Sequence, residues 1–259
     1  MFKLLYSFLY NLFMKTNGDA VGAKRNKPLH KFTIYGERCS GTNYLERLIE
    51  NNFEASVTWE YGWKHFFGFD QDKLKGSGDT LFICIVRDID SWMNSFFRNM
   101  YHLPLKYKKI PMEDKKTPFL NDEIWSFDEK IKNYSGNKFA SREILEDRNM
   151  YTGNRYQNIF ELRHTKLKYM MEDLPNKVRN CILIRYEDLI NDFENTMIKI
   201  KDKGLSVKKG IAFPLNTFEY KKSKRKLFTT KTKVNYIERE TILNNPHLQK
   251  YYETKLKYL

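Results

Sequence analysis

The feature that most constrains the fold is an apolar run at residues 80–86, TLFICIV. A run of this length, without alternation of polar and apolar positions, indicates a β-strand that is buried on both faces. It ends at Arg87, and the stretch SWMNSFFR at residues 91–98 then has the character of a helix. The chain of 259 residues is 41% hydrophobic and 15% aromatic, which is enough for a core and excludes disordered and fibrous classes. Its length fits one large domain or two small ones.

A strand–loop–helix unit precedes this strand. Residues 31–35, KFTIY, form a short strand-like run, and residues 44–53 carry apolar side chains at helical spacing. Between them, Gly36 and Gly41 have the spacing of a nucleotide-binding P-loop. Such a loop directs free backbone N–H groups and the positive end of a helix dipole at an anion. Residues 42–43 are Thr-Asn where a triphosphatase has Lys and Ser or Thr, so we do not expect a standard ATPase or GTPase. A plain turn without a ligand is the alternative interpretation.

Arg87 and Ser95 form a second candidate anion site. Arg87 follows the buried strand directly, and Ser95 lies eight residues later on the expected helix. In open α/β sheets ligands bind at the carboxyl ends of strands, so we expect Arg87 to share one rim with the loop at residues 36–42. A guanidinium and a hydroxyl suit a terminal phosphate group. The alternative interpretation is a surface ion pair of Arg87 with Asp88 or Asp90.

These elements together resemble the PAPS-dependent sulfotransferases, which use 3′-phosphoadenosine 5′-phosphosulfate (PAPS). The resemblance rests on Ser-Gly-Thr at residues 40–42 after one strand, Arg87 and Ser95 after the next, and LIRYEDL at residues 183–189 after a third. It covers residues 31–205, with a weaker match around Tyr236. It implies an α/β fold of three layers with a central parallel sheet and a P-loop-like sulfotransferase architecture. It also implies transfer of a sulfuryl group from PAPS to a hydroxyl or amine without a metal.

The resemblance assigns the two ends of the nucleotide to the two loops. In the family the first loop holds the 5′-phosphosulfate, and the second element holds the 3′-phosphate. The position before Ser40 usually carries Lys or Arg in the family, whereas here it is Cys39, which leaves Arg38 as the available cation. The residues expected to bind the 5′ end are Arg38, Cys39, Ser40, Gly41, Thr42 and Asn43, and those expected to bind the 3′ end are Arg87 and Ser95.

Lys64 and His65 lie in an aromatic stretch, WEYGWKHFF at residues 59–67, and resemble the family's Lys and His pair near the reaction centre. In that role His65 takes the proton of the acceptor, while Lys64 stabilises the bridging oxygen and then the departing nucleotide. Other branches use Glu, and Glu60 lies at a similar distance past the loop. We favour His65 because an unperturbed His titrates near neutrality, whereas a Glu base needs a raised pKa. An aromatic-packed surface His is the alternative interpretation for His65.

A basic segment at residues 199–233 contains twelve Lys and Arg against two acidic residues. Family members place here a basic loop that closes over the 3′-phosphate, for which the candidates are Lys224, Arg225, Lys226, Lys231 and Lys233. A patch for nucleic acid or for anionic acceptors such as sulfated glycans is the competing explanation. No helix-turn-helix, zinc-finger or RNP-type motif accompanies the segment, so nucleic acid is not an expected partner.

The N-terminal residues 1–14, MFKLLYSFLYNLFM, are apolar except for three polar positions at intervals of four. We expect a terminal helix packed on the domain, with an interfacial membrane helix or a signal anchor as alternatives. A linker-like stretch follows, which divides the chain into residues 1–29 and a sulfotransferase-like domain at residues 30–259. The three cysteines are an odd count, and two lie in apolar runs, which favours a reducing compartment such as the cytoplasm. Membrane association through residues 1–14 is the alternative.

The sequence therefore predicts a PAPS-dependent sulfotransferase, with a carbohydrate hydroxyl favoured as acceptor over a tyrosine or a small alcohol. No His/Cys cluster with metal-ligand spacing is visible, so no metal is expected. One alternative is another P-loop group transferase, such as a diverged kinase. The other is a non-catalytic protein on this fold that binds a polyanion or nucleic acid.

Overall fold

The computed structural model describes residues 29–69, 71–104, 107, 109–127, 143–220, 223–226 and 235–259, with only the backbone of residues 217–220 and 223–226. The expected N-terminal helix and linker, and the candidates Lys231 and Lys233, lie outside the described residues. Leu29 already belongs to the fold, since it is buried and its N–H donates to the Gly204 carbonyl at 3.1 Å. In the part of the chain that is described, no helix is long and apolar enough to span a bilayer.

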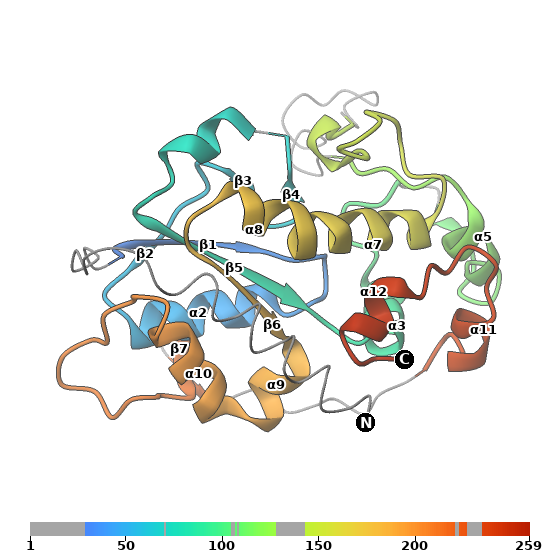
Figure 1. Cartoon of the computed structure of the whole chain (residues 1–259). Coiled ribbons are helices and arrows are strands. Elements are labelled where there is room, and N and C mark those ends of the chain that lie inside the picture. Colours follow the sequence, from blue (N-terminus) through green and yellow to red (C-terminus); the bar gives the residue numbers. More distant parts are fainter. Residues whose placement is uncertain are drawn as a thin grey trace, which may run out of the picture.

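A central sheet of four parallel strands organises the molecule (Figure 1). Its strands run in the order β2 (Ser56–Val57), β1 (Lys31–Tyr35), β5 (Thr80–Val86) and β6 (Cys181–Arg185). The chain passes from β1 through helix α2 (Thr42–Asn52) to β2 on one side, and β5 then enters on the other side of β1. The carboxyl ends of β1 and β5 therefore flank the point where the strand order reverses, which is the usual ligand-binding position of such sheets. The prediction of an α/β fold with a central parallel sheet is confirmed.

Helices cover both faces of this sheet (Figure 1). All seven residues of β5 are buried, and alternate side chains point to opposite faces. Leu81, Ile83 and Ile85 share a core with α2 and α10 (Phe193–Lys201), whereas Phe82, Cys84 and Val86 share one with the end of α7 (Ile159–Lys168) and the turn that follows it. This burial on both faces explains why residues 80–86 show no polar alternation.

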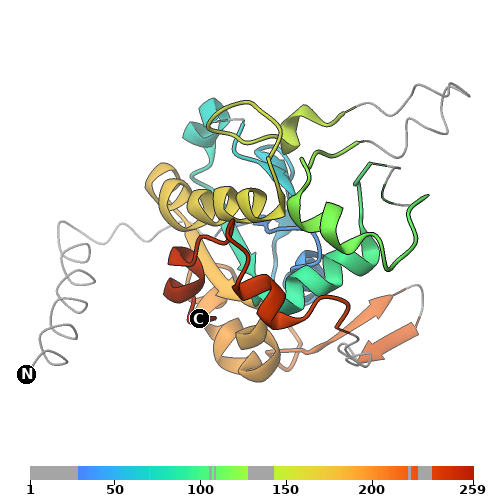
Figure 2. The same ribbon diagram turned by 90° about the vertical axis from the view of Figure 1, so that its right-hand side faces the viewer.

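A third apolar cluster lies beside the sheet. It joins α3 (Ile89–Asn99), α5 (Lys116–Asn121), the start of α7 and the C-terminal α11 (Arg239–Leu243). The last helix, α12 (Tyr251–Lys255), lies beside α7 in both views (Figures 1 and 2). The remaining elements are β3 (Gly62–Trp63), β4 (Phe66–Phe67), η1 (Gln71–Gly76), η2 (Leu145–Asp147), η3 (Tyr169–Asp173), α8 (Leu174–Lys177), α9 (Tyr186–Asn191), β7 (Thr217–Tyr220) and β8 (Ser223–Lys226).

The helix around residue 160 differs from the sequence pattern at both ends. Apolar spacing predicts one helix over residues 151–174 that ends before Pro175. The helix instead begins at Ile159, because the Asn158 side chain caps it by accepting hydrogen bonds from two N–H groups of the first turn. It continues through the π-helical turn η3 into α8, where Pro175 occupies the first turn. A missing N–H is tolerated at that position.

Candidate active site

The first loop, residues 36–43, joins β1 to α2 and leaves backbone N–H groups outside the helix. Gly41 caps α2 with a φ of +100°, and its carbonyl accepts the first N–H groups of the helical ladder. The N–H groups of residues 41–43 precede these bonds, so they are not used within α2. Ser40 is buried, and its hydroxyl donates to the Glu37 carbonyl at 2.7 Å, which closes the loop into a turn. A loop of this form at a helix N-terminus suits an anion.

Arg87 and Tyr186, which directly follow β5 and β6, both lie against this loop. Arg87 Nη1 donates to the Cys39 carbonyl at 3.0 Å, and its guanidinium carbon lies 4.9 Å from the centre of the Tyr186 ring. Tyr186 begins α9 directly after β6, and a Cβ on Gly41 would lie only 2.6 Å from its ring. Only glycine therefore fits at position 41. The expectation that Arg87 and the first loop share one rim of the sheet is confirmed.

Arg87 contacts the loop and not the acidic residues that follow it in sequence. The Asp88 carboxylate caps α3 by accepting the Ser91 N–H at 2.9 Å, and it lies 3.5 Å from Arg239. Arg87 Nε is buried and has no hydrogen-bond partner among the described residues. A surface ion pair of Arg87 with Asp88 or Asp90 is therefore not what the structure shows.

Ser95 lies on α3 against the first loop. Its carbonyl accepts a hydrogen bond from the Cys39 thiol at 3.7 Å. Burial raises the pKa of this thiol, and it outweighs the bond to Ser95 and the opposing charges of Arg38, Arg87 and Arg98. Cys39 therefore stays a neutral thiol at pH 7, which favours a filler over a reactive group. The guanidinium groups of Arg87 and Arg98 add positive potential at this loop.

Arg38 extends into a buried ionic cluster. Its guanidinium lies 3.1 Å from the Asp147 carboxylate and donates to the Ser126 hydroxyl. Lys166, on α7, donates to the same carboxylate and to the His65 carbonyl, the latter at 2.7 Å. Arg38, Asp147 and Lys166 are each no more than 3% exposed. The structure thus uses the charge of Arg38 to pair with Asp147, and it does not place that charge on the surface of the loop.

The hairpin formed by β3 and β4 holds Lys64 and His65 against the first loop. The Gly36 N–H donates to the Lys64 carbonyl at 3.0 Å, and His65 Nδ1 donates to the Gly36 carbonyl at 2.8 Å. Lys64 Nζ donates to the Asn43 side-chain oxygen and lies 3.2 Å from a Glu46 carboxylate oxygen, both on α2. Two of the three candidate catalytic residues, Lys64 and His65, are therefore brought to the loop expected to bind the 5′ end.

His65 is buried, and burial lowers the pKa of its imidazole well below the ordinary value of 6.5. The charges of Arg38, Lys166 and Lys64 act in the same direction, and only the bond to Gly36 opposes them. Because a carbonyl oxygen can only accept, the proton of the neutral ring lies on Nδ1, and Nε2 carries the free lone pair. The ring packs 4.9 Å from that of Trp63, so aromatic packing of His65 is confirmed but a surface position is not.

Glu60 lies away from this site. It is exposed, and its charge contributes, after the larger effect of Asp79, to raising the pKa of Lys31. Lys31 is the first residue of β1, whereas the first loop follows the last residue of that strand. Of the two candidate bases, the structure brings His65 to the loop and leaves Glu60 near the opposite end of β1.

A buried ion network joins the first loop, and the second loop formed by Arg87 and Asp88 between β5 and α3, to the C-terminal helix α12. Arg163, on α7, donates from Nη1 to the Glu37 carboxylate at 2.8 Å and from Nη2 to the Arg87 carbonyl at 2.9 Å. It also donates to the Glu253 carboxylate of α12, from Nη2 at 2.8 Å and from Nε. Burial raises the pKa of Glu37 to about 7, although the charge of Arg163 opposes this.

Sequence reasoning missed the position of Arg163. For Arg155, Tyr156 and Arg163 the sequence leaves contact with the nucleotide as an alternative and favours a solvated position, but Arg163 is 1% exposed. The available signal was its spacing, because Arg163 lies four residues from both Ile159 and Leu167 and so belongs to the apolar face of α7. A charged residue on that face requires a buried partner.

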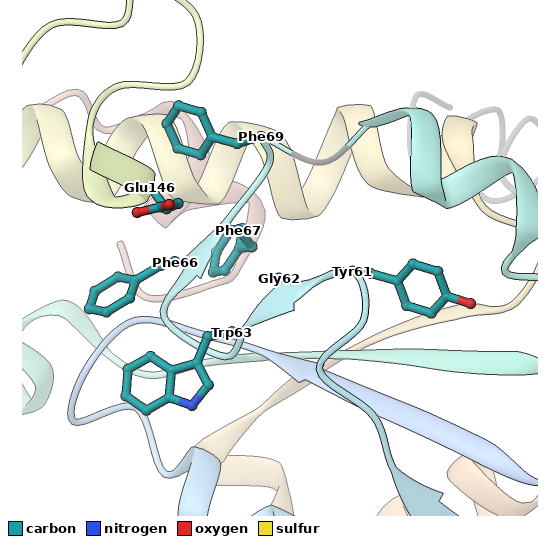
Figure 3. A pocket seen from close by; sticks show the side chains of 7 residues that line it. All are labelled: Tyr61, Gly62, Trp63, Phe66, Phe67, Phe69 and Glu146. Atoms are coloured by element: carbon teal, nitrogen blue, oxygen red, sulfur yellow. The ribbon is translucent and has the colours of Figure 1, made fainter. Parts of the chain in front are cut away.

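An aromatic pocket of about 200 Å³ lies beside the same hairpin (Figure 3). Figure 3 shows Phe66, Phe69 and Glu146 gathered near one end of it, with Tyr61 directed the other way. Trp63 and Phe66 line the pocket and also contact the His65 ring, at 4.9 and 6.4 Å between ring centres. The pocket wall is therefore in contact with the candidate base. The full lining is Tyr61, Gly62, Trp63, Phe66, Phe67, Phe69 and Glu146.

Ile237, which follows the basic segment in sequence, is bonded to α3. The Ile237 N–H donates to the Asn94 side-chain oxygen at 2.8 Å, and the Asn94 amide donates to the Ile237 carbonyl at 3.0 Å. Asn94 directly precedes Ser95. Within the described ranges, no group of three or more His, Cys, Asp or Glu side chains is arranged to hold a metal ion.

No protein-family model matches the chain, and no curated protein is significantly similar to it. The arrangement of the two loops and the hairpin is therefore the basis for a functional interpretation.

Proposed function

We propose that the protein is a sulfotransferase that transfers the sulfuryl group of PAPS to a hydroxyl group of an acceptor. The observation that carries this proposal is the contact between the two loops, in which Arg87 Nη1 donates to the Cys39 carbonyl at 3.0 Å, at the ends of the paired strands β1 and β5. One loop offers N–H groups to one phosphate, and the other offers a guanidinium to a second. Two anion sites this close suit a nucleotide that carries phosphates on both the 3′ and 5′ positions of one ribose.

The polar groups of the site fit such a ligand. Arg87 Nε is buried and has no partner among the described residues, and a buried donor of this kind gains from an anionic acceptor. Cys39 and Gly41 have φ angles of +66° and +100°, a backbone form that turns neighbouring N–H groups toward one side. PAPS bound here would supply a sulfuryl group attached to a good leaving group. Binding, orientation and proton transfer would fall to the protein.

In this proposal His65 accepts a proton and Lys64 stabilises negative charge. His65 is neutral with its Nε2 lone pair free, so it can accept the proton that the acceptor hydroxyl loses as its oxygen forms the new bond to sulfur. Lys64 Nζ is held at the start of α2 by Asn43 and Glu46, beside the loop proposed for the 5′ end. Its positive charge there offsets the negative charge that develops on the oxygen of the departing nucleotide.

The aromatic pocket is the proposed acceptor site. Its volume of about 200 Å³ is smaller than the roughly 300–1,000 Å³ of sites that enclose a drug-sized ligand, so it suits one ring of a larger acceptor. Aromatic walls pack against the C–H faces of a sugar ring, and the Glu146 carboxylate can accept hydrogen bonds from sugar hydroxyls. A carbohydrate hydroxyl therefore stays favoured over a tyrosine or a small alcohol.

Isothermal titration with adenosine 3′,5′-bisphosphate, the desulfated product, tests the proposal. We expect roughly micromolar or tighter binding, which Arg87→Ala weakens by about 30-fold, or ~2 kcal/mol, because a charge-assisted bond is lost. Arg47→Ala is the matched control, because Arg47 is an exposed Arg of α2 whose ion-pair partner is Glu50. It should change the affinity by less than about twofold. Absence of binding, or equal effects of the two variants, would refute the proposal.

Two further measurements separate the alternative functions. A diverged kinase would hydrolyse ATP in the presence of Mg²⁺, whereas the proposed enzyme would not. A polyanion-binding protein would bind heparin or DNA with a steep salt dependence that adenosine 3′,5′-bisphosphate leaves unchanged. If heparin binding were the sole activity, the basic surface and not the two loops would be the functional site.

A further inference from the structure

Two contacts connect the C-terminal segment, residues 251–258, to the second loop. We propose that this segment is a positioning element for Arg87 and Ser95, so that affinity for a 3′-phosphate depends on it. This inference rests on the proposed binding of a 3′-phosphate at that loop. It assigns a role to a part of the chain that lies more than 150 residues from Arg87 in sequence.

The first contact reaches the second loop through Arg163. Arg163 Nη2 donates to the Arg87 carbonyl at 2.9 Å, and the same nitrogen donates to the Glu253 carboxylate at 2.8 Å. Arg163 and Glu253 are each 1% exposed, so water cannot replace either partner. Glu253 therefore fixes the position from which Arg163 bonds to the loop.

The second contact reaches the next residue through Glu187. The Asp88 N–H donates to one Glu187 carboxylate oxygen at 3.0 Å, and the Tyr258 hydroxyl donates to the other at 2.7 Å. The Tyr258 ring is packed in the core on the same face of the sheet as Cys84. Tyr258 thus holds Glu187 in the orientation in which it accepts from Asp88.

Both contacts end on one peptide unit. The Arg87 carbonyl and the Asp88 N–H belong to the same planar group, so this group is held at both edges by side chains that the C-terminal segment positions. Its orientation sets the direction of the Arg87 side chain. It also sets the start of α3, because the Asp88 carboxylate accepts the Ser91 N–H at 2.9 Å, and α3 carries Ser95. The first loop also bonds to Arg163, through Glu37, and it has a separate attachment to the β3–β4 hairpin through His65.

Tyr258→Phe removes one of these contacts and leaves the ring in place. We expect this variant to bind adenosine 3′,5′-bisphosphate roughly 3–10-fold more weakly, since one hydrogen bond to a carboxylate is lost. Its affinity for adenosine 5′-monophosphate should fall by less than about twofold. Tyr251→Phe is the matched control from the same segment, because Tyr251 is 55% exposed and should change neither affinity. Equal weakening of the two nucleotides, or no change for the bisphosphate, would overturn the inference.

Hydrogen exchange at the Asp88 amide provides a test that needs no nucleotide. Tyr258→Phe should accelerate exchange at this amide at least about threefold, and Tyr251→Phe should leave it unchanged. If the wild-type protein binds neither nucleotide, the proposed function is wrong, and the exchange rate alone then decides whether the segment positions the peptide. An unchanged rate in Tyr258→Phe would refute the positioning role.

Discussion

Asp147 balances two buried cations, so its removal tests whether the cluster around Arg38 is one interdependent unit. Asp147→Asn keeps the size of the side chain but removes the charge that pairs with Arg38 at 3.1 Å and with Lys166. Removing one partner of a buried ion pair costs roughly 3–5 kcal/mol, because an uncompensated charge stays buried. In a protein of this size each kcal/mol corresponds to about 2–4 °C, so we expect the Tm to fall by roughly 6–20 °C.

Differential scanning calorimetry of three variants gives the measurement and its controls. Asp202→Asn is the exposed control, because its carboxylate is 66% exposed and 4.0 Å from Lys201, a pair worth about 0–1 kcal/mol. A triple variant, Arg38→Met, Asp147→Leu and Lys166→Met, should recover most of the loss, since apolar side chains then replace the whole cluster. A Tm loss in Asp147→Asn no larger than that of the control would refute the reasoning.

Three further predictions concern pH and substrate binding. Burial raises the pKa of Glu37 from 4.5 to about 7, so between these values the folded protein retains a proton that the unfolded chain releases. The free energy of unfolding, measured by denaturant titration, should therefore fall as the pH rises through this interval. Glu37→Gln should flatten this dependence on pH. Burial lowers the pKa of His65, so kcat/KM should be flat above pH 6.5, and His65→Ala should reduce kcat by roughly 10²–10⁴-fold with nucleotide affinity unchanged. Trp63→Ala should raise the KM for the acceptor more than the KM for PAPS in initial-rate measurements. A rise in stability with pH would contradict the first prediction, and an ionisation of His65 above pH 6.5 would contradict the second. Equal changes in both KM values would contradict the third.

The regular elements could be predicted where the signal is local. Residues 31–35 and 80–86 form strands with the predicted bounds. In both cases the strand pattern and the residue at which it ends lie next to each other in sequence, so no tertiary contact is needed to recognise them. The meeting of Arg87 with the first loop was also predictable, since neighbouring parallel strands end at the same edge of a sheet. The start of α7 could not be predicted in this way. The apolar spacing continues on the N-terminal side of Asn158, whereas the helix begins only after this residue, which caps it.

The buried ionic contacts could not be predicted, because they pair residues from distant parts of the chain. Helical spacing places Arg163 on an apolar face, but it does not identify Glu253, ninety residues later, as the partner. The same holds for Arg38, which the motif suggested as a cation for the 5′ end and which the fold pairs with Asp147. A charge next to a ligand-binding motif can serve the ligand or the core, and only the tertiary contacts distinguish these uses.

Gly36 has a consequence for how the proposed enzyme would work. Its N–H and carbonyl are both bonded to the turn that carries Lys64 and His65, and a Cβ at this position would lie 2.7 Å from the Ile85 carbonyl oxygen. The backbone proposed to bind the anion and the side chain proposed to accept the proton are therefore joined by two hydrogen bonds through Gly36. In the proposed enzyme, the base would then be aligned with the donor by the fold itself, without a closing motion of this hairpin.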